Sequence, residues 1–249
     1  MSNLFGREKE MEVLRQRLGK RRSFFLHGPA GVGKTALLTS LLPEFPTVLY
    51  CAESASKLSV FRALGVALLA TGSPAAARAL KSAENIKAKS AIAIKGVVLD
   101  LLRCGQYSVV LDHLCQPSAA FASEIREVAN WGSTAVIGVA RSPHMEDVGF
   151  LRSLFADRRE RVELKNFELE SAASFARWVI AGTGLCAGNL EDFLERVLEL
   201  SQGNPGAIIS MVRMAREPKY RSKDCIKITP LYVDFRLSSP ADGGRSRIP

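Results

Sequence analysis

Short apolar segments alternate with longer amphipathic ones over the first two thirds of the chain. The apolar segments lie at residues 23–27, 47–52, 107–111, 133–140 and 161–165. Segments with the apolar period of a helix lie within residues 1–20, 33–42, 57–71, 81–104, 119–130 and 146–156. Short apolar runs are typical of buried strands, and strands that alternate with helices form a mostly parallel sheet. The pattern therefore predicts an α/β fold, with helices on both faces of the sheet.

From about Phe167 onward the pattern predicts helices only. They cover residues 170–182, 190–201 and 205–216. The predicted domains are an α/β core at residues 1–166, a small helical domain at 167–216 and a C-terminal extension at 217–249. In the extension, residues 226–235 have the pattern of a strand, which would pack on the core or pair with a partner. Residues 236–249 lack periodicity and predict a loose, partly disordered tail.

Composition and charge narrow the class of protein. The chain has 34 lysines and arginines against 25 acidic residues, a net charge of +9. This excess favours an acidic partner such as nucleic acid, but it is spread along the chain, so a solvated basic surface explains it about as well. Five cysteines without C-x-x-C spacing indicate thiols in a reducing cytosol rather than a zinc site. No apolar run approaches the ~18 residues of a membrane span, and the N-terminus lacks a signal peptide's apolar stretch, so we expect a cytoplasmic protein.

A glycine-rich motif follows the first predicted strand. Residues 28–35 read Gly-Pro-Ala-Gly-Val-Gly-Lys-Thr and fit the pattern G-x-x-x-x-G-K-[ST] of a phosphate loop. The glycines let the backbone curl around phosphate oxygens, and the next helix presents its positive end to the same anion. Lys34 can reach the β- and γ-phosphates, and the Thr35 hydroxyl can bind Mg²⁺. The predicted nucleotide-binding residues are Gly28, Pro29, Ala30, Gly31, Val32, Gly33, Lys34, Thr35 and Ala36.

The third predicted strand ends in a carboxylate. Three apolar residues precede Asp112, which lies where ligands of parallel sheets bind, at the carboxyl end of the strand. Because a phosphate loop needs a carboxylate that holds the metal, we expect Asp112 to bind Mg²⁺ together with Thr35.

His113 follows, where many ATPases with such a loop carry a Glu that polarises the attacking water. A neutral imidazole is a poorer substitute in that role. Two interpretations stay open: His113 orients the water, or it only ends the strand and hydrolysis is slow.

These motifs and their order resemble P-loop ATPases of the AAA+/STAND group, the signal-transduction and origin-recognition-like ATPases. Residues 4–8, Leu-Phe-Gly-Arg-Glu, are similar to the N-terminal element beside the adenine in that group, which makes Arg7 a cofactor-binding candidate. Gly203-Asn204-Pro205 is similar to the GxP element of the helical lid, so Pro205 is expected near the nucleotide. The match covers about residues 4–216. It implies ATP and Mg²⁺ as cofactors and a three-layer P-loop sandwich with strand order 5-1-4-3-2.

In that order the fourth strand lies between the phosphate-loop strand and the Asp112 strand. Arg141 ends the fourth strand, so its guanidinium is expected to face the γ-phosphate; the alternative is a surface arginine. The second strand becomes the sheet edge, about 14 Å from the loop, so we reject Glu53 at its end as the catalytic base. Three arginines precede the fifth strand, where an oligomeric ATPase would hold a finger for its neighbour; a solvated charge run is the alternative. They are Arg158, Arg159 and Arg161.

The function predicted is an ATP-binding, slowly hydrolysing, Mg²⁺-dependent switch. Its expected catalytic residues are Lys34, Asp112, His113 and Arg141. A DNA-associated loader or motor is the first alternative: the net charge favours it, whereas the roughly 33 residues after Arg216 are too few for a winged-helix module. A nucleotide-binding module with little or no hydrolysis is the second, favoured by His113. Arg141 favours the STAND branch, because members that load helicases usually have Asn there. The expected partners are ATP and ADP, with a protein partner or a second copy, and no membrane.

Overall fold

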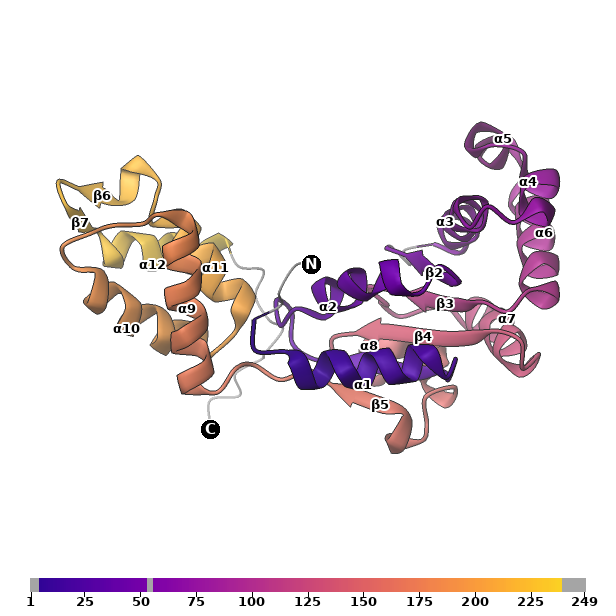
Figure 1. Cartoon of the computed structure of the whole chain (residues 1–249), viewed down its shortest axis with the longest axis horizontal. Coiled ribbons are helices and arrows are strands. Elements are labelled where there is room, and N and C mark those ends of the chain that lie inside the picture. Colours follow the sequence, from indigo (N-terminus) through magenta and orange to yellow (C-terminus); the bar gives the residue numbers. More distant parts are fainter. Residues whose placement is uncertain (1–4, 53–55, 239–249) are drawn as a thin grey trace. The chain divides into compact units, whose positions relative to one another are not determined.

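The computed structural model describes residues 5–52 and 56–238 of the chain. It divides into two compact units, Met1–Lys165 and Asn166–Pro249, and each is described by itself (Figure 1). Leu4, Glu53 and the expected loose tail from residue 239 onward lie outside the described residues. Within the described ranges, no helix is both long and apolar enough to cross a membrane.

The first unit is built on a five-stranded sheet in the order β2-β3-β4-β1-β5. The strands are β1 (Phe24–His27), β2 (Val48–Cys51), β3 (Ser108–Leu111), β4 (Ala135–Ala140) and β5 (Arg161–Glu163). All four neighbouring pairs are parallel, and His27 of β1 lies opposite Ala140 of β4 and Glu163 of β5. This is the predicted order 5-1-4-3-2 counted from the other edge, so the predicted α/β fold class is confirmed.

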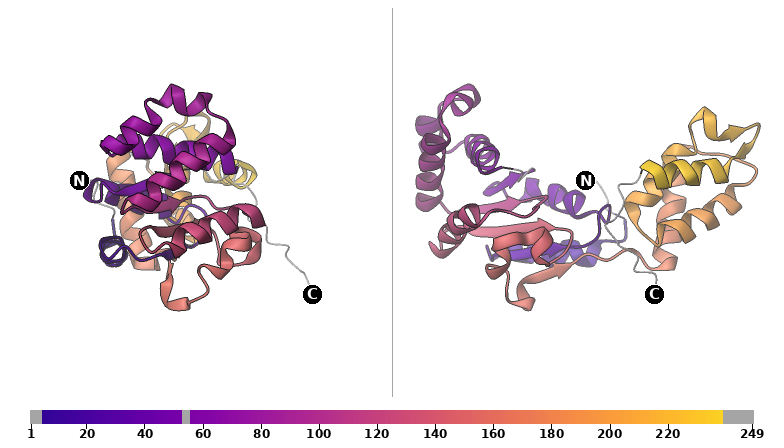
Figure 2. Two further views of the ribbon diagram at one scale, coloured as in Figure 1. Left: turned by 90° about the vertical axis from the view of Figure 1, so that its right-hand side faces the viewer. Right: turned by 180° about the vertical axis from the view of Figure 1, so that it is seen from behind.

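Helices cover both faces of this sheet (Figures 1 and 2). The helices of this unit are α1 (Glu8–Gly19), α2 (Lys34–Leu41), α3 (Lys57–Ala70), α4 (Pro74–Leu80), α5 (Ala83–Ala88), α6 (Ala91–Cys104), α7 (Ala119–Asn130) and α8 (Met145–Val148). Of these, α4 and α5 pack against α3. Short 3-10 helices lie at Leu42–Glu44, Gly149–Ser153 and Arg158–Glu160. Leu26 of β1 packs with Leu14 and Leu38 of α1 and α2, whereas Phe25 packs with residues of α3, α6 and α7 such as Leu64. Adjacent residues of one strand thus belong to two cores, as alternation along a buried strand requires.

The single helix predicted over residues 81–104 is wrong, because this segment contains two helices and α4 precedes them. Lys81 ends α4 with a positive φ of 63°. The hydroxyl of Ser82 accepts a hydrogen bond from the Asn85 N–H, and that of Ser90 accepts one from the Ala93 N–H. Each serine therefore caps the start of a new helix, which is a local alternative to continuing the previous one.

The helix predicted over residues 146–156 is also wrong beyond its first turn. α8 ends at Val148, and Gly149 follows with a φ of 53°. A Cβ on Gly149 would lie 2.8 Å from the Pro117 carbonyl oxygen, so a side chain does not fit there. The chain continues as the 3-10 helix Gly149–Ser153.

The second unit consists of helices and a short antiparallel hairpin. The helices are α9 (Leu169–Thr183), α10 (Leu190–Ser201), α11 (Pro205–Met214) and α12 (Ile228–Ser238), with a 3-10 helix at Pro218–Tyr220; the hairpin strands are β6 (Arg221–Ser222) and β7 (Cys225–Ile226). A Cβ on Gly203, whose φ is 74°, would lie 2.0 Å from the Phe167 carbonyl oxygen. Asn204 caps α11, and Pro205 is its first residue. The Gly203–Pro205 motif therefore has a local role in starting α11.

The strand predicted over residues 226–235 is wrong. Only Ile226 of this segment is in a strand, and α12 begins two residues later. Leu231 is 2% exposed, and the Tyr220 hydroxyl donates a 2.6 Å hydrogen bond to Asp234. Apolar residues at positions 228, 231, 232 and 235 have the period of a helix. The strand prediction considered only the alternation of apolar and polar residues in this segment.

Candidate functional site

The phosphate loop connects β1 to α2 at the carboxyl end of the sheet. Its three glycines all have positive φ: 152° at Gly28, 76° at Gly31 and 101° at Gly33. A Cβ on Gly28 would lie 2.1 Å from the Leu164 carbonyl oxygen, just after β5, and the Gly28 N–H donates to the Arg141 carbonyl just after β4. The loop is thus held between two neighbouring strand ends, and the helix after it presents its N-terminal end there.

Lys34 is the first residue of α2 and folds back over the loop. Its Nζ donates to the Gly28 carbonyl at 2.6 Å and to the Pro29 carbonyl at 2.9 Å. Burial lowers the pKa of Lys34; the Asp112 carboxylate opposes this, and the Arg141 guanidinium adds to it. The ammonium group therefore lies beside the backbone curl that would cradle phosphates, within the electrostatic reach of two other predicted site residues.

Asp112 and Thr35 meet in the structure. The Thr35 hydroxyl donates to Asp112 Oδ2 at 2.8 Å, and the Asp112 side chain is 1% exposed. A hydroxyl and a carboxylate beside a phosphate loop are the protein ligands that Mg²⁺ uses in such sites, with phosphate and water oxygens completing its shell. The donor set therefore fits Mg²⁺ bound with a nucleotide. Across the described residues no cluster of three or more His, Cys, Asp or Glu could hold a metal.

Tyr50 is a site residue that the sequence analysis missed. Its hydroxyl donates to Asp112 Oδ2 at 2.6 Å, the oxygen that also accepts from Thr35. Burial raises the pKa of Tyr50, and the Asp112 carboxylate raises it further. Tyr50 lies opposite Val110 in the parallel β2–β3 pair, so it is on the same face of the sheet as Asp112, two residues further along. Once the register of β2 against β3 is known, the sequence shows that positions 50 and 112 lie on one face of the sheet.

His113 follows with its backbone in the left-handed region, at a φ of 52°. Its N–H donates to Asp112 Oδ1 at 2.7 Å. The imidazole is 67% exposed, and its Nε2 lies 3.8 Å from Asp112 Oδ2. The backbone of His113 thus holds the carboxylate, while its ring stays in solvent beside it.

Arg141 lies at the end of β4, between the strands that lead to the phosphate loop and to Asp112. The residue is exposed, and its charge acts on Lys34. Asp147 of α8 also acts on Lys34, with the opposite sign, and its Oδ2 accepts a 2.6 Å hydrogen bond from Ser142. Nothing in the sequence pattern indicated Asp147.

Arg7 is buried behind the loop. One guanidinium nitrogen donates to the Lys165 carbonyl at 2.7 Å and to the Val32 carbonyl at 3.4 Å, and the other bonds to Glu10 at 2.8 Å. These contacts link the N-terminal segment to the phosphate loop and to the last residue of the first unit.

The remaining candidates lie elsewhere. Pro205 belongs to the second unit and is described with it. Arg159 pairs with Asp157, and Arg161 donates to two backbone carbonyls, of Phe155 and Ala156. Arg158 is exposed.

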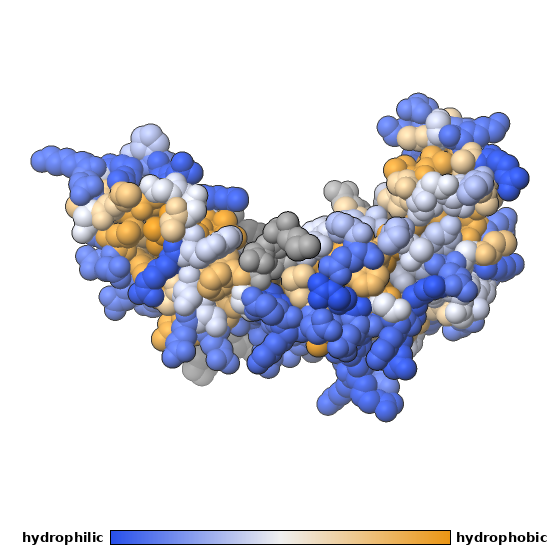
Figure 3. All heavy atoms as spheres, viewed as in Figure 1, coloured by the Kyte–Doolittle hydropathy of each residue, from blue (hydrophilic) through white to orange (hydrophobic). Residues whose placement is uncertain are grey.

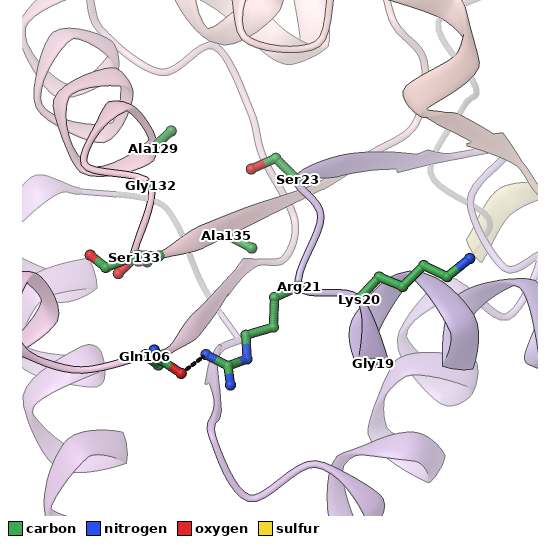
Figure 4. Close-up of a pocket in the computed structure, with 10 residues that line it drawn as sticks. Gly19, Lys20, Arg21, Ser23, Gln106, Ala129, Gly132, Ser133 and Ala135 are labelled. Atoms are coloured by element: carbon green, nitrogen blue, oxygen red, sulfur yellow. Dashed lines mark hydrogen bonds between the residues drawn. The ribbon is translucent and has the colours of Figure 1, made fainter.

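A cavity of about 420 Å³ lies at the opposite end of the sheet, where the strands begin (Figure 4). Ser23, just before β1, and Ala135, the first residue of β4, are among its lining residues. Arg21 donates a 2.6 Å hydrogen bond to Gln106 there. The Ser133 hydroxyl is buried and has no hydrogen-bond partner among the described residues. This cavity contains none of the predicted site residues.

Comparisons with known proteins agree with this fold. The family model described as the AAA ATPase domain matches residues 3–137, more than half of the chain. Among solved structures the chain is similar to a Walker-type ATPase of Pyrococcus abyssi, with 20% identity and a TM-score of 0.57 over 85% of this chain and 67% of that one. It is also similar to the ORC1 protein of Aeropyrum pernix in complex with DNA, with 14% identity and a TM-score of 0.61 over 95% of this chain and 66% of that one.

A third similar structure is a signal transduction ATPase with numerous domains (STAND) from Pyrococcus horikoshii, which carries a tetratricopeptide repeat sensor. Identity is 15% and the TM-score 0.51, over 95% of this chain and 33% of that one. At these identities the similarities show the fold alone. The chain spans about two thirds of the first two proteins and one third of the STAND protein. No curated protein matches the sequence.

Proposed function

The chain belongs to the AAA ATPase domain family, and on that premise we propose that it is a slow, Mg²⁺-dependent ATPase that works as a nucleotide-driven switch. Membership of this family implies nucleotide binding. The reaction proposed is cleavage of the bond between the β- and γ-phosphates by water.

The observation that carries the proposal is the meeting of three groups at the start of α2. Lys34 Nζ lies on the carbonyls of the phosphate loop, and Thr35 donates to Asp112 Oδ2. Lys34 and Thr35 begin α2, whereas Asp112 follows β3. The three residues converge where the N–H groups of the loop and the N-terminus of α2 favour an anion. A glycine-rich turn with only a structural role would not require a buried carboxylate beside it.

Each residue has a distinct role in the proposed reaction. The loop backbone and Lys34 bind the phosphates, and Thr35 and Asp112 hold Mg²⁺. Mg²⁺, when bound, neutralises charge on the phosphate oxygens. Arg141 stabilises the charge of the terminal phosphate from the tip of β4. None of these roles includes a base that takes the proton of the attacking water.

Slow hydrolysis is proposed because His113 occupies the position after Asp112. The ring is exposed, and it lacks the negative charge with which a carboxylate orients water. The protein would therefore keep ATP bound for long periods, as suits a switch better than a motor. We propose that ATP and ADP favour different arrangements of the helical unit, with Pro205 acting at the nucleotide, and so expose different surfaces to a protein partner or a second copy.

The test is an ATPase assay in Mg²⁺ and in EDTA, together with titration of a fluorescent ATP analogue. We expect saturable ATP binding and slow hydrolysis that requires Mg²⁺. Sizing the protein with ADP and with a non-hydrolysable ATP analogue tests the switch, because a switch predicts a nucleotide-dependent change in size or assembly. Absence of nucleotide binding would overturn the proposal, whereas binding without turnover would identify a nucleotide-binding module.

A DNA-associated ATPase is the second candidate, and one basic segment of the chain favours it. Residues 57–104, which include α3 to α6, carry eight lysines and arginines and two acidic residues. Hydrophilic side chains cover the region of α5 in Figure 3. Basic side chains attract the DNA backbone in a salt-dependent manner, and in this segment Lys57 and Lys95 already pair with Glu124. ATPase rates that rise severalfold with duplex DNA would favour this candidate, and unchanged rates would favour the switch.

A further inference from the structure

We propose that Tyr50 is a positioning residue for the Mg²⁺ site: its phenol fixes the carboxylate of Asp112 in the orientation that binds the metal. This inference rests on the proposed nucleotide site and deepens it. Tyr50 does not belong to the phosphate loop or to the Asp112 strand. It comes from β2, the edge strand on the far side of β3.

The carboxylate of Asp112 is held at both oxygens. Oδ2 accepts two hydroxyl hydrogen bonds, from Tyr50 at 2.6 Å and from Thr35 at 2.8 Å, and Oδ1 accepts the His113 N–H at 2.7 Å. Three donors of the described residues thus favour one rotation of this carboxylate about its Cβ–Cγ bond. Because hydrogen bonds to a charged acceptor are about twice as strong as neutral ones, the phenol of Tyr50 contributes strongly to that orientation.

The strand register explains how a tyrosine of β2 reaches this carboxylate. Tyr50 of β2 lies opposite Val110 of β3, and Asp112 comes two residues after Val110. With strands about 4.8 Å apart and a rise of about 3.3 Å per residue, such diagonal neighbours are roughly 8 Å apart, a distance that an aromatic side chain can span. A tyrosine also presents its hydroxyl at the end of a rigid ring, so little conformational freedom is lost in forming the bond.

Tyr50 and Thr35 have different relations to the metal. Thr35 can give a lone pair to Mg²⁺ while its O–H still donates to Asp112, so it can serve both as ligand and as donor. Tyr50 donates to the same carboxylate oxygen without belonging to the predicted ligands. Residues that orient metal ligands in this way typically contribute 10–100-fold to metal affinity.

The experiment is a Mg²⁺ titration of the Tyr50→Phe variant, read as binding of a fluorescent ATP analogue. Phenylalanine keeps the ring and its packing and removes only the hydroxyl. We expect the Mg²⁺ concentration at half-saturation to rise by about tenfold or more, while affinity for the analogue in EDTA stays equal to that of the wild type. Tyr107→Phe is the matched control, because Tyr107 is also half-buried but lies just before β3, at the opposite end of the strand, and its variant should titrate like the wild type.

Two results would overturn the inference. Equal Mg²⁺ midpoints for Tyr50→Phe and the wild type would show that the phenol does not act on the metal site. An equal loss of affinity in Mg²⁺ and in EDTA would show that Tyr50 only supports the fold of the pocket. Tyr50→Phe added to Asp112→Asn should change the Mg²⁺ midpoint no further, because the oriented charge is already gone. If the wild type itself binds no nucleotide, the proposed function fails first, which is a different result.

Discussion

The two ends of the central sheet differ in what their loops carry, although they belong to the same five strands. At the carboxyl ends, Lys34, Thr35 and Asp112 are joined to one another or to the loop backbone by hydrogen bonds of 2.6–2.9 Å. At the amino ends, the cavity contains a hydrogen bond from the Arg21 guanidinium to the Gln106 side-chain oxygen, and the Ser133 hydroxyl, which has no partner among the described residues. Helix N-termini and glycine turns concentrate ligand-binding groups at the carboxyl ends of the strands. The cavity at the amino ends is lined by Lys20 and Arg21 but by no acidic residue that the structure describes.

Replacing Lys34, at the carboxyl ends of the strands, should lower nucleotide affinity more than any other substitution proposed below. In Lys34→Ala the charge-assisted contacts to phosphate are lost, each worth roughly 1.5–3 kcal/mol, so ATP affinity should fall at least about a hundredfold. The side chain faces the loop carbonyls rather than a core, so the thermal midpoint should change little. Titration of an ATP analogue measures the effect, and an affinity like that of the wild type would remove the phosphate-loop assignment.

Arg141→Ala should separate ATP from ADP. If the guanidinium contacts only the third phosphate, its loss should lower the preference for ATP over ADP by about tenfold to a hundredfold, the equivalent of one charged hydrogen bond. Parallel titrations of an ATP analogue and ADP measure this preference. Equal shifts for both nucleotides, or none, would make Arg141 a surface residue and remove the main reason for preferring the STAND branch.

His113→Glu should raise the ATPase rate, by a severalfold factor. A carboxylate at this position can orient the water and accept its proton as the bond to the γ-phosphate breaks. The substitution places an exposed side chain beside Asp112, so folding should be unaffected. A rate that stays equal or falls would mean that His113 itself positions the water or that the base lies elsewhere.

Arg21→Ala tests the other end of the sheet and should have the smallest effect. It removes the hydrogen bond to Gln106 in the cavity. Because this site is remote from the phosphate loop, nucleotide affinity and ATPase rate should stay within about twofold of the wild type, the range of ordinary surface substitutions. A large loss of ATP binding in this variant would contradict the division of roles between the two ends.

Local sequence patterns were enough to predict the fold class and the residues of the phosphate loop. The glycine-rich loop, the apolar run before Asp112 and the alternation of strands and helices are all short-range patterns, and the family's strand order followed from them. The helix boundaries around Ser82, Ser90 and Gly149 were missed because caps and close backbone contacts compete with an amphipathic pattern. α12 was missed because its apolar positions also fit an alternating strand over a short stretch.

The contacts within the site were less accessible to sequence analysis. Tyr50 reaches Asp112 only because β2 pairs with β3 in one register, and Asp147 acts on Lys34 only because the chain folds back after β4. Neither relation has a fixed spacing in the sequence. Such contacts follow from tertiary packing, so they become visible only in the structure.

The most direct test of the central claim is Mg²⁺-dependent ATP hydrolysis by the Asp112→Asn variant, measured beside nucleotide binding. The amide keeps the shape of the side chain and loses the charge that we propose to hold Mg²⁺ next to Thr35. We expect nucleotide to bind in EDTA with wild-type affinity, while hydrolysis in Mg²⁺ falls at least about tenfold. Full Mg²⁺-dependent activity in Asp112→Asn would contradict it and show that another carboxylate holds the metal.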